Sequence, residues 1–563
     1  MFTGVTFRKF ALFGTLLALF SGWAGAQSSV AAPDAGSVRQ QIEQQRDYKL
    51  PQINRQPKIT PSPEIKKKGG VIVNPKEFRF VGNKLISSQD LAFALKPFLN
   101  KELSFDGLLL AADAVAAAYK DFGVLARAYL PEQDVSDGLI TIQVVEARFA
   151  GLRTNEYTSD LVGVEVVESY FEKAQAVGKP LRVDKLDRAI LLVDDLPGIS
   201  ILGTLEPGQT EGETALFVQA KDEPRFVGDL GYDNTGSRST GSHRLTLNMS
   251  INSPGQRGEI LSANGIHTQG SDYGRLYLNV PDGFDGLRLG FSLSTLTYKV
   301  INGPGAALAV KGRSNSKGID SNYPIIRGRL HNVYWATALD NKSFFTEDIS
   351  SVRSDYESDS FRTGLSGNAF DDFGGGGSNS ASINYTKGRL TYALQNSQLT
   401  GIDPQFNKLN YSFTRQQSIV ESHSVLFSLQ GQHARQVLDS SEKFYLGGSQ
   451  SVRAYPTSEL GGERGYLVSA EWRWRVNSDW VLTAFRDQGR ATSLPATSSD
   501  QKTTSTLKGY GVSAGWQAPM GVYTKVTWSH RQGTNPKANI NSGLDSDGTL
   551  IRNRTWVTVT MPF

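Results

Sequence analysis

The sequence predicts a transmembrane antiparallel β-barrel of roughly 16 strands, preceded by two small α/β domains and an N-terminal helix. Three observations predict this fold. From about residue 225 onward, short segments alternate apolar and polar residues and are separated by Gly, Asn, Asp and Ser. Residues 74–224 contain helix-like and strand-like segments in an order that largely occurs twice. The chain also begins with basic residues and an apolar run, which is the pattern of an export signal.

Residues 1–26 predict a cleaved secretory signal peptide. Arg8 and Lys9 precede the apolar run FALFGTLLALF, and AGA at residues 24–26 has the small side chains that signal peptidase requires. Removing Arg8 and Lys9 from the 59 basic residues leaves 57, against 55 acidic ones, so the charge gives no indication of a nucleic-acid partner. The chain has no cysteine, which excludes disulfides and thiolate metal sites.

Residues 27–73 predict a helix followed by a linker. The stretch SVRQQIEQQRDYKL is compatible with a helix, whereas PQINRQPKITPSPEIKKKGG contains four prolines, a lysine run and two glycines. No segment after the signal peptide approaches the roughly 18–20 uninterrupted apolar residues that a membrane-spanning helix requires. A membrane protein of this sequence therefore crosses the membrane with strands.

Residues 74–149 and 150–224 predict two α/β domains. In the first domain FRFVG is a strand, Ser87 and Asp90 form a capping box before a helix, and a second helix ends at Gly123. The strands VLARAYL and LITIQVVEA follow. The second domain repeats much of this order with the helix VDKLDRAILLVDDL and the strands ISILGTL and TALFVQAKD. A unit that is used twice is a pair of domains and not a solenoid.

Residues 225–563 predict the barrel itself. In SHRLTLNMSIN, GLRLGFSLS, EWRWRV and WVTVTMPF, apolar side chains occupy every second position, so each strand has one apolar and one polar face. A soluble sandwich of this size would be unusually large, whereas an outer-membrane barrel turns its apolar face to lipid and its polar face to a watery lumen. The last residue, Phe563, ends an alternating strand, and a terminal aromatic residue is a common mark of such barrels.

This layout resembles the two-partner secretion transporters, which belong to a superfamily that joins polypeptide-transport-associated (POTRA) domains to an outer-membrane barrel. The stretch RAILLVDDLPGISILGTLEPG is similar to the second POTRA domain of that family, and DNTGSRSTGSHRLTLNMSINSPGQRGE is similar to its first barrel hairpin. The resemblance covers nearly the whole chain after the signal peptide. It implies a bacterial outer-membrane protein with two POTRA domains in the periplasm and the N-terminal helix as a plug in the barrel.

The resemblance also implies a role for the sequence VRAY. In the superfamily, a long loop with Val-Arg-Gly-Tyr or Val-Arg-Gly-Phe folds back into the barrel, and Phe-x-Asp-x-Gly follows on the wall. The matching residues here are Val452, Arg453, Ala454 and Tyr455 on the loop and Phe485, Asp487 and Gly489 on the wall. Because an arginine inside a narrow lumen requires a carboxylate, we expect an ion pair between Arg453 and Asp487.

Two points about this loop stay open at the level of sequence. Alanine at position 454 departs from the glycine of the family and costs about 1 kcal/mol if the position requires a positive φ. Without the wall motif, Arg453 would be predicted to be a solvated extracellular arginine.

The resemblance implies a protein-export function. The expected partner is a large secreted exoprotein with an N-terminal secretion domain, which passes the barrel unfolded and without nucleotide hydrolysis; outer-membrane lipid and the barrel assembly machinery are expected partners as well. We expect the exoprotein to dock on the second POTRA domain by strand addition or in a groove, with residues 183–196 and the strand around TALFVQA as first candidates. The alternatives are an assembly factor that inserts other barrels and a passive porin.

The sequence predicts no enzyme, no metal site and no cofactor. GVSAG at 511–515 fits the Gly-x-Ser-x-Gly elbow of hydrolases, but Ser513 lies in an alternating strand whereas the elbow requires a strand-to-helix turn. The six histidines are scattered and lack the spacing of metal ligands. DDFGGGGSNS has the glycines of a phosphate loop without its lysine, and predicts a turn.

Overall fold

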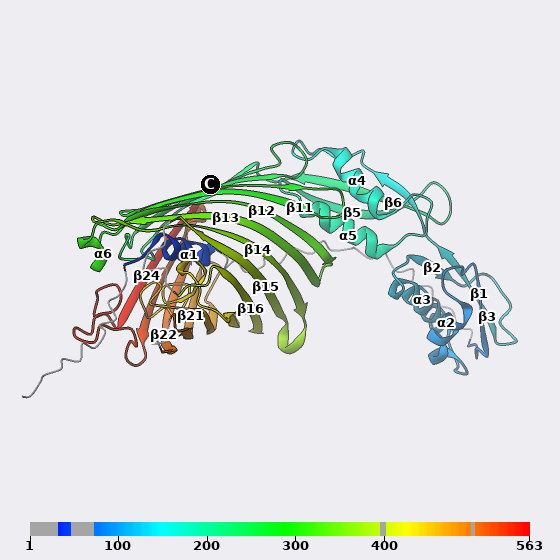
Figure 1. Cartoon of the computed structure of the whole chain (residues 1–563). Coiled ribbons are helices and arrows are strands. Elements are labelled where there is room, and N and C mark those ends of the chain that lie inside the picture. The colour runs from blue at the N-terminus through cyan, green and yellow to red at the C-terminus, as the bar shows by residue number, and fades with distance from the viewer. Residues whose placement is uncertain (1–31, 47–71, 394–400, 497–500) are drawn as a thin grey trace, which may run out of the picture.

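The computed structural model describes residues 32–46, 72–393, 401–496 and 501–563. Figure 1 shows a barrel with two α/β domains in a row at one end and a short helix, α1, inside it. The predicted signal peptide (1–26) and the proline-rich linker (51–70) lie outside the described residues.

The first α/β domain has the predicted order of strand, helix, helix, strand, strand. Its elements are β1 (Glu77–Val81), α2 (Ser88–Ala94), the short η1 (Lys96–Phe98), α3 (Phe105–Asp121), β2 (Ala126–Tyr129) and β3 (Leu139–Glu146). The Ser87 side chain accepts a hydrogen bond from the N–H of Asp90, as the capping box predicts. Gly123 ends α3 with a φ of 82°, a conformation that glycine adopts without strain. The sheet order is β1-β3-β2.

The second α/β domain repeats the two-helix, three-strand composition. It contains β4 (Arg148–Arg153), α4 (Val164–Ala174), α5 (Val183–Asp194), β5 (Ile199–Pro207) and β6 (Glu213–Asp222). The sheet order is β4-β6-β5, so the strand around TALFVQA, which is β6, is hydrogen-bonded on both edges. The expectation that cargo adds a strand to β6 is therefore wrong. The boundary expected between residues 149 and 150 falls inside β4.

Helix α5 packs against the periplasmic turns of the barrel. Asp187 Oδ1 lies 2.7 Å from Arg329 Nη2, and Asp195 Oδ2 lies 2.7 Å from Arg327 Nε. Arg188 Nη2 donates to the carbonyl oxygen of Pro324 at 2.7 Å. These contacts hold the second α/β domain at the barrel mouth. They also cover the face of α5 that carries Asp187 and Arg188, so this part of residues 183–196, which were the first candidates for docking, is not free to receive cargo.

In the described part of the chain, sixteen antiparallel strands close the barrel, as predicted, with the last strand paired to the first. The strands are β7 (Phe226–Asp233), β8 (Arg244–Asn252), β9 (Ile260–Thr268), β10 (Ser271–Pro281), β11 (Arg288–Lys299), β12 (Lys311–Arg327), β13 (His331–Glu347), β14 (Val352–Asp371), β15 (Gly377–Tyr392), β16 (Gln405–Val420), β17 (His423–Ala434), β20 (Arg464–Arg475), β21 (Trp480–Ser493), β22 (Thr503–Gln517), β23 (Tyr523–Arg531) and β24 (Asn553–Pro562). Closure pairs every strand edge, as hydrocarbon surroundings require.

The barrel wall is uneven in length. β12 and β13 have 17 residues each and β14 has 20, whereas β7 has 8 and β8 has 9. The GVSAG sequence lies within β22, so Ser513 is in the middle of a strand. The DDFGGGGSNS stretch forms the turn from β14 to β15, where Gly374, Gly375 and Gly376 all have positive φ.

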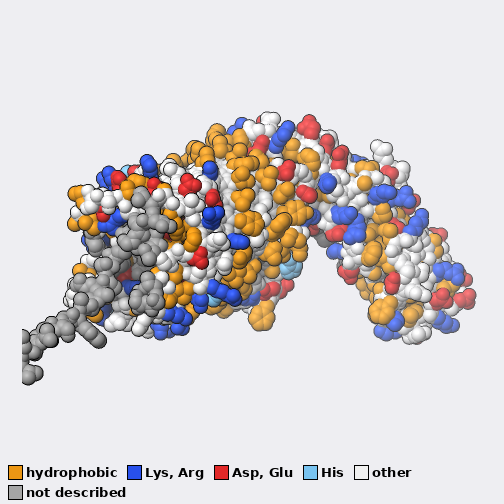
Figure 2. Space-filling model, viewed as in Figure 1, with side chains coloured by type: hydrophobic (Ala, Val, Ile, Leu, Met, Phe, Trp, Pro, Cys, Tyr) orange, Lys and Arg blue, Asp and Glu red, His pale blue; other side chains and the backbone are white. Residues whose placement is uncertain are grey.

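The outer surface of the barrel is apolar, as the alternation predicts. On β8, Leu245, Leu247 and Met249 are all exposed on the outer face, and Trp472 and Trp474 are exposed on β20. On the side in view, Figure 2 shows a band of hydrophobic side chains across the barrel, with more charged side chains toward its ends. Among the described helices, none has the length and apolar character to cross a membrane.

Helix α1 (Ala35–Arg46) fills part of the barrel lumen. Asp34 caps it by accepting the N–H of Ser37 at 2.8 Å. Ala35, Val38 and Ile42 are buried in an apolar cluster with inward-facing aromatic residues of the upper barrel, including Tyr298, Phe344 and Tyr356. The helix therefore packs against the wall from within.

Candidate functional site: the lumen loop

We define the lumen loop as residues 435–463, which connect β17 to β20. It contains a small hairpin made of β18 (Phe444–Leu446) and β19 (Leu460–Gly462). Gly447 and Gly448 have φ values of 105° and 99°, and a side chain on Gly447 would clash with the Pro456 carbonyl oxygen. These glycines turn the chain so that VRAY reaches the barrel wall.

The structure brings Arg453 and Asp487 together. Arg453 Nη2 lies 2.7 Å from Asp487 Oδ1, and its Nε and backbone N–H both donate to Asp487 Oδ2, at 2.8 and 3.1 Å. Glu471 accepts from Arg453 Nη1 at 2.8 Å, and Ser469 accepts from Nη2 at 2.9 Å. Arg453 and Asp487 are 6% and 1% exposed, so this is a buried ion pair with additional hydrogen bonds.

Two further contacts fix the position of Arg453. Its guanidinium lies 3.4 Å from the ring centre of Phe485, in the geometry of a cation–π contact. Its carbonyl oxygen accepts hydrogen bonds from Ser529 Oγ at 2.7 Å and from Trp556 Nε1 at 2.8 Å. Strands β21, β23 and β24 therefore all hold this one loop residue.

The rest of the motif is packed closely against glycines on the wall. Val452, Ala454 and Tyr455 are fully buried. A methyl group on Gly489 would lie 2.8 Å from Leu446 and 3.0 Å from Val452, and one on Gly509 would lie 2.6 Å from the methyl group of Ala454. Position 454 does not have a positive φ, so alanine there carries no backbone strain. The methyl group of Ala454 requires room, and the absence of a side chain on Gly509 provides it.

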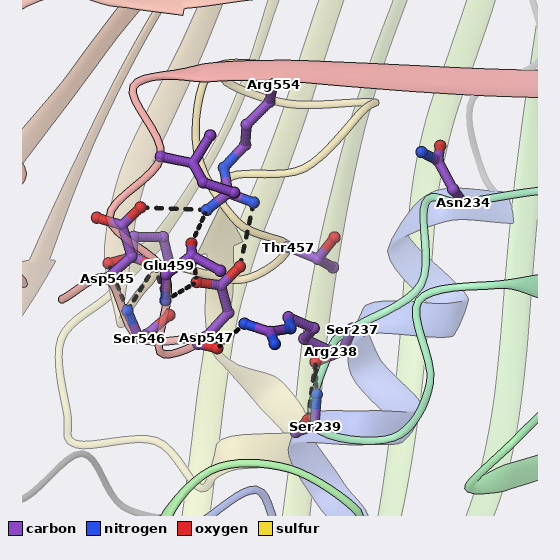
Figure 3. Close-up of polar contacts among 12 residues, drawn as sticks. Asn234, Ser237, Arg238, Ser239, Thr457, Glu459, Asp545, Ser546, Asp547 and Arg554 are labelled. Atoms are coloured by element: carbon purple, nitrogen blue, oxygen red, sulfur yellow. Dashed lines mark hydrogen bonds and ion pairs between the residues drawn. The ribbon is translucent and has the colours of Figure 1, made fainter.

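A second group of polar contacts ties the lumen loop to the last extracellular loop, residues 532–552 (Figure 3). Glu459 accepts hydrogen bonds from Asn535 and Ser546. Asp545 pairs with Arg531 and, at 3.1 Å, with Arg554. The buried Glu459 and Asp545 therefore join the two loops into one polar network.

The first extracellular segment takes part in the same network. The Thr457 hydroxyl donates to the carbonyl oxygen of Thr235 at 3.1 Å, and Arg238 Nη1 donates to that of Asp547 at 3.3 Å. Asn234 Nδ2 donates to the Thr555 carbonyl oxygen at 3.0 Å. These contacts cross the seam between β24 and β7 at its extracellular end.

Two buried residues, Arg453 and Glu459, anchor the lumen loop, and their electrostatics differ. Burial alone would lower the pKa of Arg453, but its hydrogen bonds to Asp487 and the charges of Asp487 and Glu471 raise it, so the arginine is cationic. Burial raises the pKa of Glu459 above its ordinary value, against the hydrogen bonds from Ser546 and Asn535. The anchor at Arg453 is therefore an ion pair, whereas the one at Glu459 depends on hydrogen bonds from neutral groups.

Helix α1 contacts both the wall and the lumen loop. Arg39 donates to Ser294 Oγ at 2.7 Å, and Glu43 Oε2 lies 3.2 Å from Lys342 Nζ. The hydroxyl of Ser440 on the lumen loop donates to the Asp34 carboxylate, and its Oγ lies 2.8 Å from both carboxylate oxygens. A polar cavity of about 360 Å³ remains between helix, loop and wall.

Phe563 lies at the seam. Its N–H donates to the Gly228 carbonyl oxygen at 3.0 Å, and the Gly228 N–H donates back to its carbonyl oxygen at 3.1 Å. Its side chain is 57% exposed on the outer surface. The β24–β7 register contains five residue pairs, whereas β7–β8 contains eight.

The sequence analysis missed several residues of this site. Glu471, Ser469, Glu459 and Asp545 were not singled out, although Glu471 and Ser469 stand on the polar face of the EWRWRV strand. The strand register explains their role, because it places Ser469 opposite Asp487 and Glu471 opposite Phe485. Within the described residues, no group of three or more His, Asp or Glu side chains has an arrangement that holds a metal ion.

Known proteins resemble this chain in both its barrel and its α/β part. The family model for haemolysin secretion/activation proteins ShlB/FhaC/HecB matches residues 212–518, and the ShlB-type POTRA model matches residues 73–147. The heme/hemopexin transporter protein HuxB of Haemophilus influenzae (strain 86-028NP) is 25% identical over 82% of this chain and 84% of its own length. The outer membrane transporter CdiB of Escherichia coli O6:K15:H31 is 24% identical over 80% of this chain and 79% of its own.

A solved structure has the same fold. CdiB from Escherichia coli superposes with a TM-score of 0.71 at 19% identity, covering 95% of this chain and all of that one. Barrel, inserted loop and POTRA domains together define an outer-membrane transporter of the two-partner secretion class. The chain belongs to the ShlB/FhaC/HecB family of haemolysin secretion/activation proteins. Its barrel lies in the outer membrane with the POTRA domain in the periplasm, and the family exports exoproteins, so neither the assembly factor nor the passive porin is favoured.

Proposed function

We propose that this transporter exports one large exoprotein with an N-terminal secretion domain, and that the lumen loop and α1 must both move before the cargo passes. The observation that carries this proposal is the occupied lumen. Arg453, Glu459, Arg39 and Glu43 hold the two obstructions by ion pairs and hydrogen bonds. Such contacts are exchangeable, because water or polar groups of the cargo can replace them.

The position of the second α/β domain supports cargo delivery at the barrel mouth. The ion pairs of Arg327 and Arg329 with α5 keep this domain in place. With β6 in the centre of its sheet, the edge strands are β4 and β5. The backbone of Phe149 on β4 is already hydrogen-bonded to Gly178 and Lys179, so β5 is the strand that we assign to addition. Asp194 already accepts the N–H of Ile201, and the Pro207 carbonyl oxygen accepts from Arg153 Nη2 at 3.2 Å, so we assign strand addition to residues 203–206 between them. Leu202 and Leu205 on β5 are exposed and give an arriving chain apolar contacts.

We assign the chain no covalent chemistry and no cofactor. Transport then relies on cargo folding outside the cell in place of nucleotide hydrolysis. Arg453 is a positioning residue that holds the lumen loop against Asp487. The remaining proposed partners are outer-membrane lipid around the barrel and the barrel assembly machinery that inserts it.

The test compares the native Gram-negative host with a strain that lacks this gene. Mass spectrometry of culture supernatant and outer membrane is expected to show the loss of one or two very large exoproteins with the other barrels unchanged. Broad depletion of other outer-membrane barrels would move the protein to the assembly class, and an unchanged exoproteome would refute the export proposal.

A further inference from the structure

The outer face of β12–β14 changes from apolar to polar at one level of the strand register. Along β12, Ile319 is followed by Lys317, and along β14, Phe361 is followed by Asp359. The register aligns the polar positions in a single row, Lys317–Asn341–Asp359–Arg389–Gln405, that runs across β12 to β16, and the next position in this row, on β11, is the apolar Leu293. The row lies toward the end of the barrel opposite the α/β domains, which is the extracellular side. It marks the outer edge of the hydrocarbon band.

A groove of about 900 Å³ on the lipid-facing surface is lined by this row and by the apolar side chains next to it. Its apolar lining includes Leu276, Leu293, Ile319, Leu339 and Phe361. These five side chains are among the more exposed hydrophobic ones, with Leu293 at 62%. A hollow of this kind on the outside of a barrel fits acyl chains better than a flat lipid-facing surface does.

Three cationic side chains border the same groove: Lys317, Lys387 and Arg389. The one acidic side chain in the outward row, Asp359, accepts a hydrogen bond from Asn341 Nδ2 at 2.7 Å. Within the described part of the chain, no ion pair engages any of the three cations. Their charge is therefore available to a ligand.

We propose that this groove binds a phosphorylated, acylated disaccharide lipid of the outer leaflet, with its acyl chains over the leucines and its phosphates on Lys317, Lys387 and Arg389. Charge complementarity and the extracellular position select this occupant, because cations next to an apolar surface attract anionic headgroups. Lys317 on β12 and Arg389 on β15 are three strands apart, or about 14 Å at the usual strand spacing. This separation suits a disaccharide with a phosphate at each end. The site lies outside the lumen and depends only on the outer-membrane location of the barrel.

The test is native mass spectrometry of the purified, delipidated full-length protein with two defined lipids. One is the acylated disaccharide with two phosphates, and the other is the same lipid without phosphate. The variant is the triple substitution Lys317→Gln, Lys387→Gln, Arg389→Gln. The matched control is Arg486→Gln, Arg490→Gln, Lys508→Gln, which removes three exposed cations from the outer face of β21 and β22, where they border none of the grooves described above.

We expect the unmodified protein to prefer the phosphorylated lipid, and the groove variant to bind it about a hundredfold more weakly, at about fivefold per charge. The control variant should retain near-normal binding. An equal loss of lipid binding in both variants would show a general attraction of the lipid to cations and would overturn the proposed site. No loss of lipid binding in either variant would overturn it as well. If the groove variant fails to fold, the comparison of the two lipids on the unmodified protein decides, and equal binding of both lipids overturns the proposal.

Discussion

Removal of the Arg453 guanidinium is the sharpest perturbation of the lumen loop. Arg453→Met keeps much of the side-chain volume but leaves Asp487, which is 1% exposed, without its cation. Breaking a buried pair by removing one partner costs about 3–5 kcal/mol. The backbone carbonyl of residue 453 would still accept from Ser529 and Trp556, and the N–H would still reach Asp487, so the loss falls in the lower half of that range, about 3 kcal/mol.

The assay is equilibrium chemical unfolding of the barrel in lipid vesicles, for Arg453→Met, Asp487→Asn and the double variant. A double-mutant cycle isolates the coupling between the two side chains, for which we expect about 2 kcal/mol or more. Arg473→Met is the control, because Arg473 also pairs with Glu471 but is 27% exposed in its side chain. Its expected cost is at most about 1 kcal/mol. A coupling energy as small as that of the control would refute the buried-anchor interpretation.

Three further outcomes are expected. Gly509→Ala should destabilise the loop by about 1–3 kcal/mol through its clash with Ala454, and the added substitution Ala454→Gly should recover most of that loss in the same unfolding assay; failure of the second change to rescue would show that the clash is not the cause. Deletion of residues 32–46 should raise single-channel conductance in planar bilayers, because α1 occupies the lumen, and unchanged conductance would exclude a plug. Arg327→Ala with Arg329→Ala should broaden the distance distribution between spin labels on the second POTRA domain and the barrel, whereas Arg182→Ala, whose ion pair with Asp184 is local and exposed, should leave it unchanged.

The barrel and the α/β domains were predictable because burial follows local periodicity. Alternation in SHRLTLNMSIN places Leu245 and Leu247 outward, and the structure confirms it. The family and the export function were predicted from resemblance and are confirmed by the family match. The pairing of Arg453 with Asp487 came from the two superfamily motifs, since no local pattern connects positions 34 residues apart.

Other parts of the site depend on register and docking, which sequence patterns do not contain. Glu471 joins the anchor only because β20 pairs with β21 in one particular register. Asp187 and Asp195 have the spacing of a solvated helix face, and only the folded chain brings Arg329 and Arg327 to them. The backbone at Ala454 could not be foreseen either, because family glycines suggest a positive φ that this position does not adopt.

The barrel strands differ in length, so the two sides of the pore mouth are not equivalent. β7 ends at Asp233, with Tyr232 as its last outward side chain, whereas β12 continues from Lys317 to Lys311 beyond the edge of the hydrocarbon band. The pore mouth is therefore bordered by long strands on one side and by short strands on the other. The side with short strands includes the seam between β24 and β7. There, Thr457, Arg238 and Asp547 bring the lumen loop, the first extracellular segment and the last loop together. We expect a polypeptide that displaces those contacts to leave the pore on the side of the shorter strands.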